Sequence, residues 1–162
     1  MTSKLISKHA LKVIEQTISN YPKDRKQSAV LTALMEVQHE NKGYLTEELM
    51  DEVAELLEMP KVSVYEVASF YSMFQTEPCG RNNIAVCTNV SCMLRGSDKI
   101  VEHLEKKLGI KLGESTQDGK FFLKKEEECL AACCAAPVMQ VNHVYHENLD
   151  IEKVDEILSK LK

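Results

Sequence analysis

The sequence predicts an α+β protein in which a small helical bundle is followed by a small sheet covered by helices. Up to residue 74, apolar side chains recur every three or four residues, which is the period of one face of an α-helix. Residues 75–83 (QTEPCGRNN) concentrate Pro, Gly and Asn, which favour turns. After them, short segments typical of strands alternate with helical ones. These changes predict a helical domain over 1–76, for docking or support, and a second domain over 77–162.

Four short amphipathic helices with brief connections predict a small bundle for the first domain. Thr46 is the expected N-cap of the third helix, because its hydroxyl can accept a hydrogen bond from an unpaired amide of the first turn. Ser63 and Glu66 have the spacing of a capping box, which would start the fourth helix at Ser63. That helix is expected to continue towards Phe74. The four helices are expected over 3–19, 24–40, 46–57 and 63–74.

The second domain is expected to combine short strands with two amphipathic helices, over 97–108 and 150–161. The expected strands are 84–87, 120–124, 138–142 and, after a tight turn, 144–145. The order strand, helix, strand, strand, helix is that of a compact α/β or α+β layer with helices covering a small sheet. It is also compatible with a thioredoxin-like arrangement.

Composition and charge disfavour several classes of function. A formal charge of −5 argues against non-specific nucleic-acid binding, which depends on Lys and Arg at phosphates. The N-terminal residues lack the apolar stretch of a signal peptide, and no segment approaches the roughly 18 to 20 apolar residues of a membrane span. A cytoplasmic protein that does not insert into the membrane is therefore expected. In a reducing cytoplasm, its six cysteines indicate metal or redox chemistry instead of disulfides.

Four cysteines are arranged in two pairs that can deliver four thiolates to one point. Cys87 and Cys92 have the spacing Cys-x4-Cys, Cys129 and Cys133 have the spacing Cys-x3-Cys, and 36 residues separate the pairs. A 2Fe-2S cluster needs four thiolates, two for each iron. Because Cys129 and Cys134 would also have four-residue spacing, spacing alone leaves the fourth ligand open between Cys133 and Cys134.

Such a cluster is anionic, so backbone amides directed at the sulfurs must offset its charge. Small residues allow this close approach, and the cysteine segments contain several of them: Ser91, Gly96, Ala131, Ala132 and Ala135. The acidic run over 126–128 should oppose reduction of the cluster and lower its potential.

Structural zinc is the main alternative, because zinc also accepts four cysteines. Zinc sites favour two-residue spacers, so spacers of four and three residues favour iron and sulfide. A dithiol oxidoreductase is disfavoured because the sequence has no Cys-x-x-Cys. Cys79 lies in the expected linker and is interpreted as a thiol near the surface. The sequence also lacks a glycine-rich phosphate loop, so no nucleotide site is expected in this chain.

Three sequence segments together resemble the E subunit of NADH:quinone oxidoreductase, which is the 24-kDa subunit of complex I. They are VYEVASFYSMF (64–74), CTNVSC (87–92) and ECLAACCAAPVMQVN (128–142), and NKGYLTEEL (41–49) extends the similarity into the helical part. The resemblance implies a helical segment followed by a thioredoxin-like ferredoxin domain with one 2Fe-2S cluster. Its ligands would be Cys87, Cys92, Cys129 and Cys133. This chain departs from the family at Ala131, where glycine is frequent, and at Cys134, which follows the fourth ligand.

The resemblance also implies a function and partners. The chain would be an electron-transfer subunit of a respiratory translocase, peripheral on the inner face of the cytoplasmic membrane. Its partners would be a subunit that binds FMN, NADH and a 4Fe-4S cluster, together with other subunits of the peripheral arm. The 2Fe-2S cluster would lie near the flavin, off the main path to quinone, and the chain alone is not expected to oxidise NADH. The alternatives are the equivalent subunit of an NAD-linked formate dehydrogenase or bidirectional hydrogenase, and a zinc-stabilised binding module.

Overall fold

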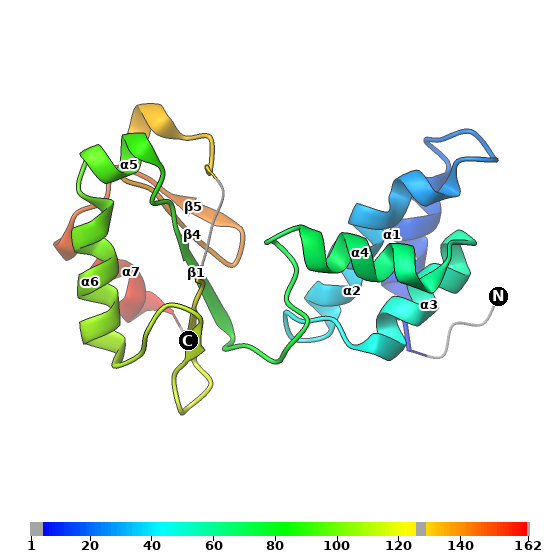
Figure 1. The fold of residues 1–162 in the computed structure, drawn as a ribbon. Helices are drawn as coiled ribbons and strands as arrows, with labels where there is room; N and C mark the ends of the chain where they lie inside the picture. The colour runs from blue at the N-terminus through cyan, green and yellow to red at the C-terminus, as the bar shows by residue number, and fades with distance from the viewer. Residues whose placement is uncertain (1–4, 126–128, 162) are drawn as a thin grey trace. The chain divides into compact units, whose positions relative to one another are not determined.

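The computed structural model describes residues 5–125 and 129–161. Its contacts divide the chain into two compact units, with the boundary between Pro78 and Cys79. Figure 1 shows helices in the first unit and a sheet with helices in the second. The predicted α+β class is confirmed, since all the strands of the described residues belong to the second unit.

The first unit is a bundle of four α-helices with one 3₁₀ turn. Its elements are α1 (Lys8–Ile18), η1 (Lys26–Ala29), α2 (Val30–Glu40), α3 (Glu47–Leu57) and α4 (Lys61–Phe70). Thr46 caps α3 as predicted, because its hydroxyl accepts a hydrogen bond from the Leu49 amide. Ser7 caps α1 in the same way, accepting from the amides of His9 and Ala10. These caps help to determine where the two helices begin.

The apolar stripes of these helices meet in one core. Fully buried examples come from each helix: Ile14, Leu34, Val53 and Val64. Gln38 is also buried, and its side chain holds the last residues of the unit. Its Nε2 donates to the Met73 carbonyl at 3.1 Å, and its Oε1 accepts from the Gln75 amide at 2.7 Å. The polar atoms of Gln38 thus fix the segment that leads into the boundary.

The predicted start and end of the fourth helix were wrong. The helix begins at Lys61, after Pro60 in an extended conformation, so Ser63 lies inside its first turn and forms no capping box. Proline has a fixed φ suited to a helix start and no amide that needs a partner, which explains the earlier start. The helix ends at Phe70, whose side chain is 77% exposed.

The second unit contains a five-stranded mixed sheet with the order β2-β3-β1-β4-β5. The strands are β1 (Asn82–Val86), β2 (Glu114–Ser115), β3 (Phe121–Leu123), β4 (Met139–Val141) and β5 (Val144–His146). β1 is parallel to β3 and antiparallel to β4. Asn142 and His143 connect β4 to β5, and both have positive φ, as a two-residue hairpin turn requires. The two-residue strand β2 was not predicted.

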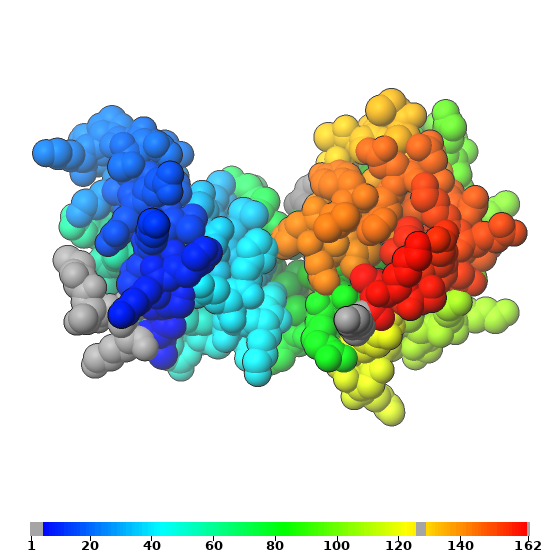
Figure 2. Space-filling view, turned by 180° about the vertical axis from the view of Figure 1, so that it is seen from behind, coloured from blue at the N-terminus to red at the C-terminus, as the bar shows by residue number. Residues whose placement is uncertain are grey.

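Two helices cover one face of this sheet: α6 (Ser97–Leu108) and α7 (Ile151–Lys160). Ile100 and Leu104 from α6 share a core with Val154 and Leu158 from α7 and with inward residues of the strands. Figure 2 shows the outer side of α7, in red, on the surface of the second unit. A short helix that the sequence did not predict, α5 (Val90–Leu94), precedes α6.

Candidate metal centre

Strand pairing brings the two cysteine segments to the same end of the sheet. Because β1 and β4 are antiparallel, the end of β1 lies beside the start of β4, with Val86 opposite Met139. The pairing continues one residue further, where the Cys87 amide donates to the Val138 carbonyl at 3.1 Å. The segment 87–92 after β1 and the segment 129–137 before β4 therefore meet (Figure 1).

Cys87 and Cys92 are buried at this meeting point. Cys87 directly follows β1, Cys92 lies in α5, and each is 2% exposed. Their side chains are hydrogen-bonded to each other. Ala136 and Val138 are buried with them, and Leu130 and Ala132 pack against the group. The second cysteine segment therefore forms part of the wall around the first pair.

Cys129 and Cys133 form a second pair on the surface. Their sulfurs lie 3.6 Å apart, and both residues are exposed. Cys133 opens a short 3₁₀ helix, η2 (Cys133–Ala135). Ala131, between the two cysteines, has φ +56, which is the left-handed region that favours glycine. The departure from the frequent family glycine thus falls where alanine costs about 1–2 kcal/mol of backbone strain.

Backbone amides are directed at the sulfur of Cys87. Burial raises the pKa of this thiol, but the amides of Leu130 and Asn89 donate to its sulfur and lower the pKa. Hydrogen bonds with the Cys92 and Asn89 side chains act in the same direction, and the pKa of Cys87 ends below its ordinary value. The site therefore stabilises a negative charge on Cys87.

The pKa of Cys92 is shifted in the opposite direction, upwards. Burial and the hydrogen bond with Cys87 raise the pKa of Cys92 to about 11, against a lowering by the Val138 amide. Nearby negative charge at Cys87 and Cys133 adds to the increase. Without a metal, Cys92 therefore keeps its proton at neutral pH, and a metal must displace that proton to bind.

Cys129 also has a sulfur that accepts a backbone amide. Donation from the Ala131 amide is the largest influence and lowers the pKa of Cys129. The hydrogen bond with Cys133, desolvation and the charges of Cys133 and Cys87 together outweigh it and raise that pKa. Charge interactions thus connect the second pair to the first.

Four thiols in two pairs, with amides directed at the sulfurs, are the donor set that an anionic cluster with two metal ions needs. The structure brings the four predicted ligands together as two pairs, and amides donate to three of the four sulfurs. Within residues 5–125 and 129–161, no group of three or more His, Cys, Asp and Glu side chains has the geometry of a metal-ion site. The acidic run over 126–128 lies outside the described residues.

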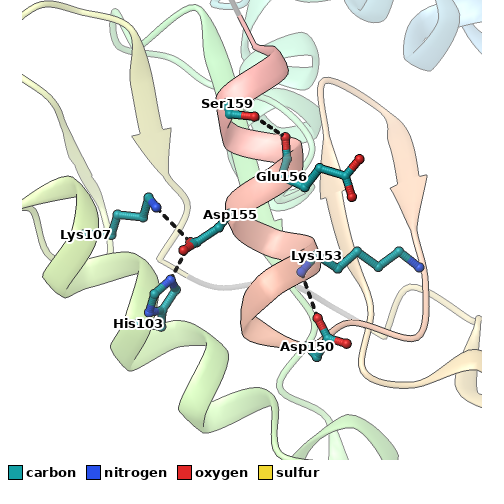
Figure 3. A network of polar contacts seen from close by, with 7 residues as sticks. All are labelled: His103, Lys107, Asp150, Lys153, Asp155, Glu156 and Ser159. Carbon is teal, nitrogen blue, oxygen red and sulfur yellow. Dashed lines mark hydrogen bonds and ion pairs between the residues drawn. The ribbon is translucent and has the colours of Figure 1, made fainter.

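The remaining cysteines and histidines lie outside this arrangement. Cys79 is half-buried next to the boundary between the units, and burial raises the pKa of its thiol. Cys134 is exposed and adjacent to Cys133. His103 is engaged by a carboxylate on α7, 2.6 Å from Asp155 (Figure 3).

An apolar surface that was not predicted from the sequence lies beside the cysteine segments. Val90, Met93 and Leu94 of α5 are 67%, 45% and 77% exposed. A signal was available, because residues 88–94 and 129–137 contain no charged side chain although 28% of the chain is charged. Uncharged, exposed apolar surface of this kind is typical of the centre of a protein interface.

A small mixed sheet with helices on one face and four cysteines at one end defines a ferredoxin of thioredoxin-like fold. Comparison with known proteins agrees: the family model described as "Thioredoxin-like [2Fe-2S] ferredoxin" matches residues 14–162. Similar curated proteins are E subunits of NADH-quinone oxidoreductases. That of Rickettsia bellii (strain RML369-C) is 46% identical over all of this chain and 96% of the relative, and one of Rhizobium meliloti (strain 1021) is 48% identical over 92% of this chain and 86% of the relative. The chain belongs to the thioredoxin-like [2Fe-2S] ferredoxins and, within them, to the E-subunit family of NADH-quinone oxidoreductases.

A solved structure has the same fold in a larger protein. The air-oxidized NAD⁺-reducing [NiFe]-hydrogenase matches with a TM-score of 0.68 and 26% identity, over 81% of this chain but 22% of the hydrogenase chain. The predicted family, the single 2Fe-2S cluster and the place in a multi-subunit oxidoreductase are confirmed. In the part of the chain that the structure describes, every helix is too short or too polar to cross a membrane.

Proposed function

We propose that the chain is the electron-transfer subunit of an NADH-quinone oxidoreductase and holds its 2Fe-2S cluster on Cys87, Cys92, Cys129 and Cys133. The observation that carries this proposal is the meeting of the two cysteine segments at one end of the sheet, with Cys129 and Cys133 Sγ 3.6 Å apart. When bound, the cluster would supply one-electron chemistry between net charges of −2 and −3. The chain supplies ligation, burial and charge compensation.

The two pairs have different tasks in this proposal. Cys87 and Cys92 are fixed by the surrounding core and restrict water on the inner side of the site. Cys129 and Cys133 lie on the outer side and shorten the distance to an electron donor in a partner. Amides of Leu130, Asn89, Val138 and Ala131 donate to sulfur and offset the negative charge, which should raise the reduction potential.

The partner is a flavin subunit that oxidises NADH. The apolar, uncharged side chains of α5 suit a permanently bound subunit, because charged residues are depleted from the core of such interfaces. The helical unit serves docking or support, and the complex holds the chain at the inner face of the cytoplasmic membrane. The cysteines of this chain would hold the cluster that exchanges single electrons with that flavin, and the chain alone would not oxidise NADH.

The NAD-linked hydrogenase subunit is the nearest alternative, supported by the fold shared with the solved hydrogenase. The identity to that protein is 26%, against 46% to the Rickettsia bellii relative, so the quinone-linked complex is favoured. Formate dehydrogenase is the related possibility within the same class. Copurification of the native complex followed by identification of its subunits distinguishes these parents.

A zinc-stabilised module is the alternative from another class. One tetrahedral zinc ion needs all four sulfurs within about 3.8 Å of one another, whereas a two-iron cluster takes them in pairs. The purified chain tests the choice through its absorption and EPR spectra before and after dithionite, with iron and zinc quantified in the same sample. About two irons per chain and a spin-half signal on reduction support the cluster. A colourless chain with about one zinc, on which anaerobic reconstitution builds no cluster, would refute it.

A further inference from the structure

The exposed cysteine pair has a geometry that suits a second kind of chemistry. Cys129 and Cys133 place their sulfurs 3.6 Å apart, and both residues are accessible to solvent. A disulfide requires a separation of about 2.05 Å, so the sulfurs must approach by about 1.5 Å. Exposed side chains can rotate by this amount without displacing a packed core.

We infer that Cys129 and Cys133 are a thiol oxidation site: in the metal-free chain they form a reversible disulfide with a small-molecule disulfide as oxidant. Oxidation would then decide whether the site can accept metal. This consequence rests on the proposed function, because a sulfur committed to a disulfide is lost as a ligand. The disulfide itself follows from the positions of the two thiols and requires no cluster.

The surroundings of the other thiols make this pair selective. Cys87 and Cys92 also contact each other, but each is 2% exposed and packed among apolar residues, so a soluble oxidant cannot reach them. Cys134 is exposed, yet the sulfur in contact with Cys129 belongs to Cys133. The reaction is therefore expected between Cys129 and Cys133.

The disulfide between Cys129 and Cys133 can form by thiol–disulfide exchange with glutathione disulfide, which is the oxidant. One protein thiol attacks the oxidant, forms a mixed disulfide and releases one glutathione. The second protein thiol then attacks the protein sulfur of that mixed disulfide and releases the second glutathione. The chain loses two electrons and two protons, glutathione disulfide gains them, and one protein disulfide replaces the disulfide of the oxidant.

The bond should be easy to reduce. It closes a loop with a spacer of three residues, and short loops give a disulfide little of the stabilisation that a long loop provides. It is also exposed, so a reducing thiol can reach it, as in labile regulatory disulfides. A shift in the cellular thiol balance would therefore open or close the metal site without other damage.

Mass spectrometry of the metal-free full-length chain tests the disulfide. The chain is stripped of metal under reducing, anaerobic conditions, transferred to glutathione buffers with increasing disulfide content, alkylated and digested. We expect two alkylatable thiols to be lost, with fragmentation locating the bond between Cys129 and Cys133. Cys134→Ser and Cys79→Ser should behave like the wild type, while Cys133→Ser should stop at a glutathione adduct on Cys129. A bond to Cys134, or adducts alone in the wild type, would overturn the inference.

Metal binding tests the consequence without any assay of activity. Cadmium alone is the probe, because its thiolate complexes absorb in the ultraviolet and cadmium ions do not reduce disulfides. We expect cadmium binding to fall at least tenfold on oxidation and to return after dithiothreitol. This result would support the inference that the disulfide controls metal binding. Unchanged binding by a chain with a proven disulfide would overturn that control. A reduced wild-type chain that builds no cluster would instead refute the proposed function, while the disulfide result would stand.

Discussion

His103 and Asp155 connect the two helices that cover the sheet of the second unit. His103 Nε2 lies 2.6 Å from Asp155 Oδ1, and Lys107 Nζ lies 2.9 Å from the same oxygen (Figure 3). The hydrogen bonds from His103 and Lys107 lower the pKa of the Asp155 carboxyl below its usual value. One carboxylate on α7 thus accepts two contacts from α6.

The first prediction concerns the acid sensitivity of this contact. Because the pKa of Asp155 is lower in the folded state, its stabilisation is present above the unfolded pKa and is lost as the pH falls through the folded one. Asp155→Asn should therefore lower the melting temperature at pH 7, and the difference from the wild type should begin to shrink as the pH falls below about 4, the unfolded pKa of an aspartate, and disappear below the lowered folded pKa. Melting of the metal-free chain between pH 3 and 7 measures this. The control is Glu152→Gln, an exposed change on the same helix, and an equal effect of both variants would contradict the prediction.

The second prediction separates the two adjacent cysteines. Cys133→Ser should lower the iron content of the reconstituted chain, because it removes a proposed ligand whose sulfur lies 3.6 Å from that of Cys129. Cys134→Ser should keep about two irons per chain. Iron analysis together with the EPR signal after dithionite provides the measurement. Equal iron loss in both variants would show that the assignment of the fourth ligand is wrong.

The third prediction concerns a tyrosine in the helical unit. Tyr65 donates to Asp51 Oδ1, and this hydrogen bond, with desolvation and nearby acidic charge, raises the pKa of Tyr65 to about 12. Stability from this contact is present below the unfolded pKa of about 10 and is lost as the pH rises through 12. Ultraviolet titration should resolve one late tyrosine, and Tyr65→Phe should remove it. If the late titration step persists in Tyr65→Phe, it belongs to another tyrosine. The control is Tyr21→Phe, which should keep the late step.

The fourth prediction tests the buried glutamine next to the boundary. Gln38→Ala leaves the Met73 carbonyl and the Gln75 amide without their side-chain partners. The free energy of unfolding should fall by about 1–3 kcal/mol, because the change removes two hydrogen bonds that each contribute about 0.5–1.5 kcal/mol. Gln16→Ala, at an exposed position of α1, should change it by less than about 0.5 kcal/mol. Urea unfolding followed by circular dichroism compares the two variants, and equal values would contradict this role of Gln38.

The fifth prediction uses two glycines that are constrained in different ways. A Cβ at Gly80 would lie 2.4 Å from the Phe121 carbonyl carbon, so Gly80→Ala must displace backbone and should destabilise by about 3 kcal/mol. Gly109 has open space but φ +68, so Gly109→Ala should cost about 1 kcal/mol of backbone strain. Thermal unfolding of both variants gives the order. A larger effect at Gly109 would show that the backbone of β3 at Phe121 moves easily to accommodate a Cβ at Gly80.

The sequence predicted those elements whose local signals agreed with one another. The helix over 97–108 has a regular apolar stripe and ends before Gly109, and the structure has the same bounds. The capping box at Ser63 and Glu66 failed because a second start signal, Pro60, lay three residues earlier and prevailed. α5 and β2 escaped prediction because five and two residues are too short to display a period.

The sequence could predict which cysteines form the site, but not that one pair is buried and the other is exposed. Spacing indicated which cysteines belong together, yet burial depends on the pairing of β1 with β4, which joins residues more than 50 positions apart. The same long-range contact places the amides of Leu130 and Val138 against Cys87 and Cys92. Such donors leave no local trace in a sequence, since any residue other than proline can supply an amide.

The pairing of β1 with β4 also determines when, during synthesis of the chain, the metal site can form. The first cysteine pair is translated early in the second unit, but the strand beside it, Met139–Val141, is translated later. Until then, Cys87 lacks both its neighbouring strand and the Leu130 amide. The two metal-binding loops therefore cannot meet around iron before both cysteine segments have been made.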